Sequence, residues 1–176
     1  LIIDEYADLS SRNSPDLLFN IMGFGQPMRE FEQARAEHLK ADFASSLAQL
    51  ADGCGIAIDR WAAAGEYAGA RADTPIAAGL IKKGHVAAQR VTIAGWIGDR
   101  PVLQFRANWY ACADLAGSEW DLRDSGWRVQ VAGDTPLDVS IRFPVAAEDY
   151  AAFTPGLTAH RAVNAIPAVC AAPKGI

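Results

Sequence analysis

The sequence contains little of what marks a nucleic-acid-binding or membrane-spanning protein. Its 16 lysines and arginines are outnumbered by 21 aspartates and glutamates, and they form no basic run. Because phosphate binding needs clustered positive charge, nucleic acid is not expected as a partner. No segment approaches the roughly 20 consecutive apolar residues of a membrane span, and we expect neither a signal peptide nor a membrane association.

Cysteine and histidine are scarce, with three residues of each. Cys54, Cys112 and Cys170 lie far apart and are odd in number, so they indicate no disulfide framework and favour a cytoplasmic location. The histidines and cysteines show no metal-ligand spacing, and no metal site is expected. No Ser/His/Asp or Cys/His signature of a nucleophilic enzyme is present either.

A nucleotide-binding element is also missing from the sequence. Gly23-Phe24-Gly25 lacks the third glycine of a dinucleotide fingerprint, and there is no Gly-Lys-Ser/Thr run. The chain starts without methionine, directly in the hydrophobic run Leu1-Ile2-Ile3. We interpret it as a piece of a longer protein.

A dense polar cluster stands between a predicted strand, residues 1–9, and a short predicted helix, residues 15–22. Ser14 suits the helix cap, Pro15 the first helical position and Asp16 the positive helix end. The preceding residues have no such local reason to be polar, and they form the candidate site: Ser10, Ser11, Arg12 and Asn13. The alternative is a turn network in which these side chains bond their own backbone.

The middle of the chain predicts an α+β domain. Apolar residues at helical spacing predict a helix from Met28 to about Ala51, ended by Gly53. Residues 56–67 are strand-like, and residues 86–97 and 102–112 form a predicted hairpin around Gly98-Asp99-Arg100-Pro101. The alternation describes an antiparallel sheet with one apolar face, which the helix would cover. The polar face is open to three interpretations: it is solvated, lines a pocket or contacts a second subunit.

Two further positions deserve individual predictions. Glu5 falls on the apolar face of the first strand, which favours an edge position, an arginine partner or a tuned acid or base. Near the end of the chain, residues 157–172 predict a helix with Pro167 inside it. Asn164 lies near the start of that helix and is either an exposed polar residue or part of a site.

Several segments resemble one enzyme family. The first runs from Glu5 to Phe19 (EYADLSSRNSPDLLF) and continues at Met22-Gly23-Phe24-Gly25. The others are Gly84–Arg90 (GHVAAQR), Gly126–Val129 (GWRV) and Arg161–Pro167 (RAVNAIP) followed by Val169-Cys170. Together they resemble the C-terminal domain of the dihydrodipicolinate-reductase-like amine dehydrogenases, the 2,4-diaminopentanoate dehydrogenase family.

The resemblance implies an α+β fold with a mixed, largely antiparallel sheet, one face covered by helices. It implies that residues 1–176 form a substrate-binding and oligomerisation domain of an oxidoreductase acting on amines and ketones. NAD or NADP would be bound mainly by an N-terminal Rossmann domain that this sequence does not contain. The partners would be a small amine or ketone and further copies of the chain, as a homodimer or higher homo-oligomer through the sheet.

The same resemblance assigns substrate binding to six residues: Tyr6, Ser10, Ser11, Arg12, Asn13 and Asn164. Arg12 would bind a substrate carboxylate as a fork, or pair with Asp8 or Asp16. The histidine-rich and lysine motif of true dihydrodipicolinate reductases is not present, so that reaction is not expected. The alternative function is a non-catalytic small-molecule-binding or dimerisation module.

Overall fold

The computed structural model describes residues 1–146 and 149–174. It divides into two compact units, Leu1–Phe143 and Pro144–Ile176. The first unit contains the sheet and the helix that covers it, and the second contains one long helix.

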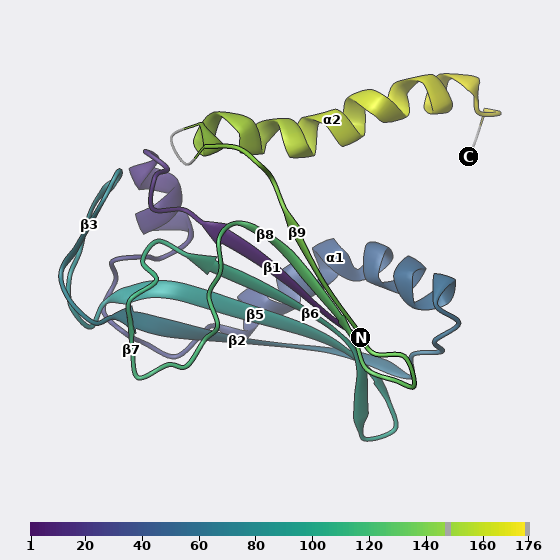
Figure 1. Ribbon diagram of the computed structural model, residues 1–176, viewed down its shortest axis with the longest axis horizontal. Helices are drawn as coiled ribbons and strands as arrows, with labels where there is room; N and C mark the ends of the chain where they lie inside the picture. The colour runs from purple at the N-terminus through teal and green to yellow at the C-terminus, as the bar shows by residue number, and fades with distance from the viewer. Residues whose placement is uncertain (147–148, 175–176) are drawn as a thin grey trace. The chain divides into compact units, whose positions relative to one another are not determined.

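Seven strands form one curled sheet in the order β7-β2-β5-β6-β1-β8-β9 (Figure 1). Their bounds are β1 Ile2–Asp8, β2 Arg60–Ala70, β5 Val86–Ile97, β6 Arg100–Tyr110, β7 Leu115–Ala116, β8 Gly126–Val131 and β9 Leu137–Arg142. β1 runs parallel to β6, and every other neighbouring pair is antiparallel. A separate ribbon pairs β3 (Thr74–Ile76) with β4 (Gly79–Ile81). The fold is therefore α+β with a mixed, largely antiparallel sheet, as predicted.

The predicted hairpin is confirmed as β5 and β6, joined at Gly98-Asp99. β1 lies between β6 and β8, so its register sets the two faces at the centre of the sheet. Asp4 is opposite Arg106 and Tyr6 opposite Asn108 on the polar face. Ile3 is opposite Phe105 on the other face, as the period-two alternation requires.

Helix α1 (Gln33–Gly53) covers the apolar face. Buried residues of the helix and the sheet form one core: Ala36, Leu47, Ala51, Val91, Ile93, Leu103, Phe105 and Ala107. The helix begins five residues later than predicted, because Pro27 forms a bridge with His85 and the following segment stays extended. The strand prediction for residues 56–67 also began too early, since Ile56 and Ile58 pack against the core before β2 starts at Arg60.

The short helix after the polar cluster is η1 (Asp16–Ile21), which is wound as a π-helix. The Met22 amide donates to the Leu17 carbonyl at 2.8 Å, five residues back. The predicted Ser14 side-chain cap is wrong. The backbone carbonyl of Ser14 instead accepts the Leu18 amide, and Pro15 occupies the cap position. Gly23 ends the helix with φ 81°, as predicted.

The second unit contains α2 (Tyr150–Ala171). It starts earlier than the predicted residue 157, because the segment from Tyr150 to Gly156 is also helical. A proline inside a helix removes one hydrogen bond and crowds the preceding turn, but α2 continues through both Pro155 and Pro167. Within the described residues, neither helix is long and apolar enough to cross a membrane.

Gly65 on β2 generates the first prediction. A Cβ added there would lie 2.3 Å from ring atoms of Phe31, which also packs against the Tyr67 ring. Gly65→Ala should lower the free energy of unfolding by about 1–3 kcal/mol, because the ring has to move out of its packing. Urea denaturation measures this change. Gly133→Ala is the matched control, since a Cβ there meets nothing within 4 Å; equal effects of both substitutions would contradict the packing described.

Candidate functional site

A cavity of about 650 Å³ lies on the helix-covered face of the sheet, where β1 ends. Segments from η1, α1 and three strands surround it. Most of its wall is apolar: Ala7, Leu9, Leu17, Ile21, Met22, Ala34, Leu39 and Trp109. The remaining lining residues are polar: Arg12, Arg35, His38, Asp42 and Gln89. The hollow is open to solvent on the side of His38 and Asp42, and a mostly apolar hollow with a few polar groups is a usual form of a small-molecule site.

Neighbouring strands supply one side of this cavity. Gln89 of β5 is opposite Trp109 of β6, which is opposite Ala7 of β1. The Trp109 Nε1 group donates a hydrogen bond of 2.9 Å to Glu5 Oε1. This explains the carboxylate on the apolar face and corrects the prediction of an edge position or an arginine partner for Glu5. β1 is an inner strand, and the hydrogen-bonding partner of Glu5 is an indole.

Gln89 is the unusual member of the lining. Its side chain shares a face with Val91 and Ile93, and the residue is only 1% exposed. Its Oε1 atom is buried and has no hydrogen-bond partner among the described residues. A buried unpaired acceptor lowers the stability of the free protein, and such groups are rare. The Oε1 atom itself has essentially no accessible surface, so it lies behind the cavity wall and is not open to the cavity.

The polar groups from α1 and from the turn before η1 differ in whether they already have partners. Arg35 donates to the carbonyls of Ile21 and Met22 and to the Tyr67 hydroxyl, which fixes η1 against α1. His38 and Asp42 pair with each other at 3.6 Å, and both side chains are more than half exposed. Arg12 has no carboxylate partner in the described chain, so the predicted pairing with Asp8 or Asp16 is not found. Its guanidinium is available to an anion.

The rest of the predicted polar segment lies beside Arg12. The Ser10 amide donates to Asp8 Oδ1 at 2.9 Å, and the Ser10 carbonyl accepts the Ala77 amide. These bonds fix the turn through its backbone. In the described part of the chain, the side chains of Ser10, Ser11 and Asn13 make no hydrogen bond, and Ser11 and Asn13 are exposed. The turn network expected as the alternative therefore accounts for Asp8 but not for these three side chains.

Of the other two predicted site residues, Tyr6 does not line this cavity. Tyr6 points to the opposite face from Ala7 and lines a separate cavity of about 340 Å³ with Arg123 and Arg142. Burial raises the pKa of Tyr6, and the Asp4 carboxylate raises it further, so the phenol stays neutral at ordinary pH. Asn164 is exposed on α2, in the second unit. A substrate-binding role for these two residues stays a prediction.

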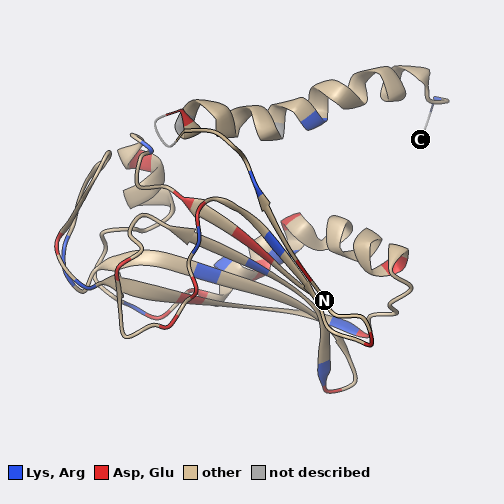
Figure 2. Ribbon diagram, viewed as in Figure 1, with Lys and Arg blue, Asp and Glu red and all other residues tan. Residues whose placement is uncertain are grey.

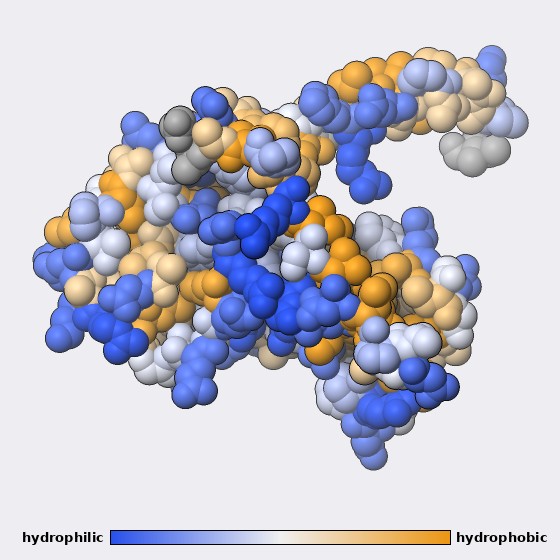
Figure 3. All heavy atoms as spheres, in the orientation of Figure 1, coloured by the Kyte–Doolittle hydropathy of each residue, from blue (hydrophilic) through white to orange (hydrophobic). Residues whose placement is uncertain are grey.

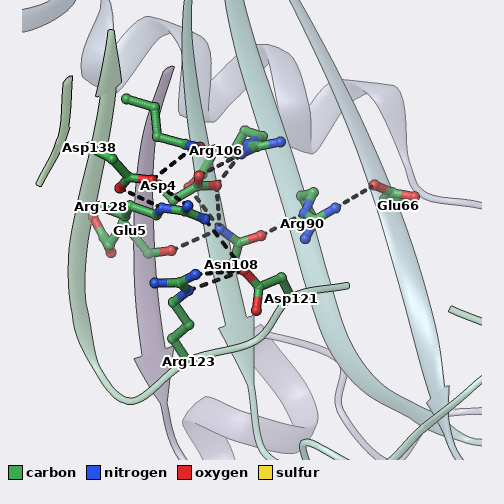
Figure 4. A network of polar contacts seen from close by, with 11 residues as sticks. Asp4, Glu5, Glu66, Arg90, Arg106, Asn108, Asp121, Arg123, Arg128 and Asp138 are labelled. Atoms are coloured by element: carbon green, nitrogen blue, oxygen red, sulfur yellow. Dashed lines mark hydrogen bonds and ion pairs between the residues drawn. The ribbon is translucent and has the colours of Figure 1, made fainter. Parts of the chain in front are cut away.

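The polar face of the sheet holds an extended network of charges, visible as paired colours in Figure 2 and as the hydrophilic centre of Figure 3. At its centre, Asp4 is 1% exposed and accepts two bonds from Arg106, at 2.7 and 2.5 Å. Asn108 Nδ2 donates to Asp4 Oδ1 at 3.1 Å (Figure 4). Arg90 donates to Asn108 Oδ1, approaches Glu66 and stacks over the Trp120 ring.

A second cluster on the same face joins β8 and β9 to the preceding loop (Figure 4). Arg128 binds both carboxylate oxygens of Asp138, and also approaches Asp121, to which Arg123 donates. These bonds lower the pKa of the Asp138 carboxyl and raise that of Arg128. None of the three interpretations of this face included what the structure shows, which is that its charges pair with one another. The network leaves little free charge for a ligand.

The cavity residues Gln89, Trp109, Arg35 and His38 were not among the predicted site residues. A signal for Gln89 exists in the sequence, because an amide stands among apolar residues at period two. Arg35 and His38 carried no such signal, since they resemble the solvated charges around them. No group of three or more histidine, cysteine or acidic side chains among the described residues is arranged to hold a metal.

The buried ion pair generates the second prediction. Arg106→Met leaves the Asp4 carboxylate buried with Asn108 as its remaining side-chain partner. The free energy of unfolding should fall by about 3–5 kcal/mol, as is typical when one member of a buried pair is removed. The double variant Asp4→Asn, Arg106→Met removes both charges and should recover most of the loss. Urea denaturation of the two variants tests this, and an equally unstable double variant would contradict the ion-pair account.

The chain matches no protein-family model, and a sequence comparison with curated proteins finds no match. Its function is therefore inferred from the cavity residues and from the motifs described above.

Proposed function

We propose that this chain is the substrate-binding and oligomerisation domain of an NAD(P)-dependent oxidoreductase acting on amines and ketones. The observation that carries the proposal is the cavity at the end of β1. It is mostly apolar, of a size suited to a small molecule, and its Arg12 has no carboxylate partner among the described residues. The same segment, Ser10–Asn13, is where the resemblance to amine dehydrogenases assigns substrate binding.

The glycine-containing turn of this chain does not fit the pyrophosphate of NAD or NADP. Gly23-Phe24-Gly25 stands at the end of η1, whereas a pyrophosphate-binding turn would stand between a strand and the start of a helix. NAD or NADP would therefore be bound mainly by a Rossmann domain and would supply the redox chemistry. The part of this chain would be to bind and orient the substrate.

Orientation matters because hydride transfer requires the reacting carbon to be held in near-attack geometry. Leu9, Leu17 and Met22 would surround the apolar body of the substrate and exclude water. Arg12 would hold a carboxylate through two parallel hydrogen bonds. The hydroxyls of Ser10 and Ser11 and the amide of Asn13 would bond polar groups at the same end.

The oligomer contact would be made by the sheet. β9 is an edge strand, and all six of its residues are exposed. Its apolar residues continue those of β8 on the helix-covered face: Val131, Leu137, Val139 and Ile141. An exposed apolar edge of this kind favours pairing with a second copy of the chain. We also propose a cytoplasmic location, because the three cysteines are free thiols.

The alternative is a non-catalytic small-molecule-binding or dimerisation module. The exposed edge strand β9 is the observation that favours it, because such an edge is sufficient for assembly without any chemistry. The two proposals differ in whether an amine supports reduction of NAD or NADP.

The third prediction tests the proposed role of Arg12. In the full-length protein with its nicotinamide-binding domain, we expect reduction of NAD or NADP that depends on an amine. Arg12→Ala should lower kcat/KM about 10–100-fold for an amino acid such as norvaline, because a charge-assisted bidentate contact is lost. The loss should be much smaller for butylamine, which has no carboxylate.

Arg100→Ala is the matched control, because Arg100 is an exposed arginine at the β5–β6 turn, away from the cavity. It should leave the kinetics for both amines unchanged. If no amine supports reduction of either nicotinamide, the enzyme proposal is refuted and the binding module is favoured. Equal losses for norvaline and butylamine would remove the carboxylate contact from Arg12.

A further inference from the structure

The exposed edge strand β9 lies in a segment whose sequence is symmetrical in its chemistry. Residues 136–144 read Pro-Leu-Asp-Val-Ser-Ile-Arg-Phe-Pro, with Ser140 at the centre. Residues at equal distances from Ser140 match as proline with proline, apolar with apolar, and acidic with basic. Such a segment complements a second copy of itself in the antiparallel direction, because each residue then meets its counterpart from the other side of the centre.

The backbone of β9 pairs with β8 on one side only, and no strand of the described residues pairs with its other side. A Cβ added at Gly126 of β8 would lie 2.3 Å from the Ile141 carbonyl oxygen, so the backbone groups of Ile141 point to β8. Neighbouring residues of an antiparallel strand point these groups to opposite sides. The N–H and C=O groups of Asp138, Ser140 and Arg142 therefore point to the open edge.

The charged side chains of β9 fit pairing with a second copy. Arg142 is weakly engaged within its own chain, since its guanidinium is 3.9 Å from Asp124 and these side chains are 75% and 88% exposed. Asp138 binds Arg128, but its side chain is about half exposed, and a carboxylate has lone pairs for more than two donors. Asp138 can therefore accept a further bond from the Arg142 of a second copy.

The opposite edge of the sheet, β2, is already occupied in part. β7 pairs with β2 at Gly69 and Ala70, and the Ala63 carbonyl accepts a hydrogen bond of 2.9 Å from Gln33 of α1. A second copy that paired there would have to displace the Gln33 side chain. β9 is thus the edge that a partner strand can reach without breaking a bond of the chain.

We infer that two copies of the chain pair β9 with β9, antiparallel, about a two-fold axis at Ser140. Asp138 of each copy faces Arg142 of the other on the polar face. Val139 faces Ile141 on the helix-covered face, where these side chains are 38% and 44% exposed in the single chain. The proline at each end of the segment lacks the N–H group needed to extend the pairing. The inference rests on the proposed function in assigning the oligomer contact to β9, and it adds the partner strand, the register and the symmetry.

The charges disfavour the other two-fold registers. An axis at Asp138 or at Arg142 places like charges opposite each other, which destabilises a strand pair. An axis at Val139 or at Ile141 places both charges opposite neutral residues, either serine or proline. The axis at Ser140 is the one within β9 that pairs opposite charges without bringing like charges together.

Substitutions of Ser140 test the register, because only an axis at this residue places it opposite itself. In the full chain, Ser140→Lys and Ser140→Glu should each raise the Kd of the dimer about tenfold, since two like charges meet at the axis. An equimolar mixture of the two variants should dimerise as tightly as the wild type, because lysine then faces glutamate. Sedimentation velocity measures these affinities. Ala64→Lys and Ala64→Glu, at an exposed position of β2, are the matched controls and should leave the Kd unchanged.

Three results would overturn the inference: a wild-type chain that stays monomeric, Ser140 variants that dimerise like the wild type, or opposite effects of the lysine and the glutamate. Opposite effects would mean a shifted register, in which residue 140 faces Asp138 or Arg142. Failure of the proposed function would look different. A chain that pairs through Ser140, but whose full-length form shows no amine-dependent reduction of NAD or NADP, would refute the oxidoreductase and leave the dimer intact.

Discussion

The arrangement of this domain depends on the buried ion pair between Asp4 and Arg106. β1 is the first strand in the chain, yet it lies between β6 and β8 and runs parallel to β6. The bidentate bond from Arg106, supported by Asn108, holds the register of β1 against β6 from the polar face. A shift by one residue would bury Glu5 in place of Asp4 and expose the apolar partners of α1, so the pair fixes both faces at once.

The position of β1 in turn determines where the cavity is. Because side chains alternate along a strand, fixing Asp4 and Tyr6 on the polar face directs Glu5 and Ala7 towards α1. Glu5 then engages the Trp109 indole, and Ala7 leaves space beside it. The chain leaves the sheet at Asp8 and turns, which carries Arg12 to the cavity. The charges on one face of the sheet thus pair with one another, whereas Arg12, beside the cavity on the other face, has no carboxylate partner among the described residues.

Patterns of neighbouring residues predicted much of this structure. The period-two alternation of residues 102–112 predicted β6 and its two faces. The helical spacing of Leu39, Phe43 and Leu47 predicted the helix that covers the sheet. Gly23 as a helix end was also correct. The fold class followed from the alternation together with the family resemblance, which added the mixed character of the sheet.

Features that depend on distant contacts could not be predicted in this way. The parallel pairing of β1 with β6 joins residues about a hundred positions apart, and nothing local in residues 1–9 encodes it. The late start of α1 depends on the bridge from Pro27 to His85. Among the candidate site residues, Arg12 lines the cavity, but Tyr6 faces the other side of the sheet. Gln89 enters the site only because three strands meet there.

The most direct test of the account is a crystal structure of the protein soaked with cyclohexylamine. The account predicts electron density for the amine between η1 and α1, with its ring against Leu17 and Trp109. Density in the cavity beside Tyr6, on the opposite face of the sheet, would contradict the assignment of the site. The assignment would also be contradicted if the amine bound elsewhere in the crystal and the cavity between η1 and α1 contained no density for it.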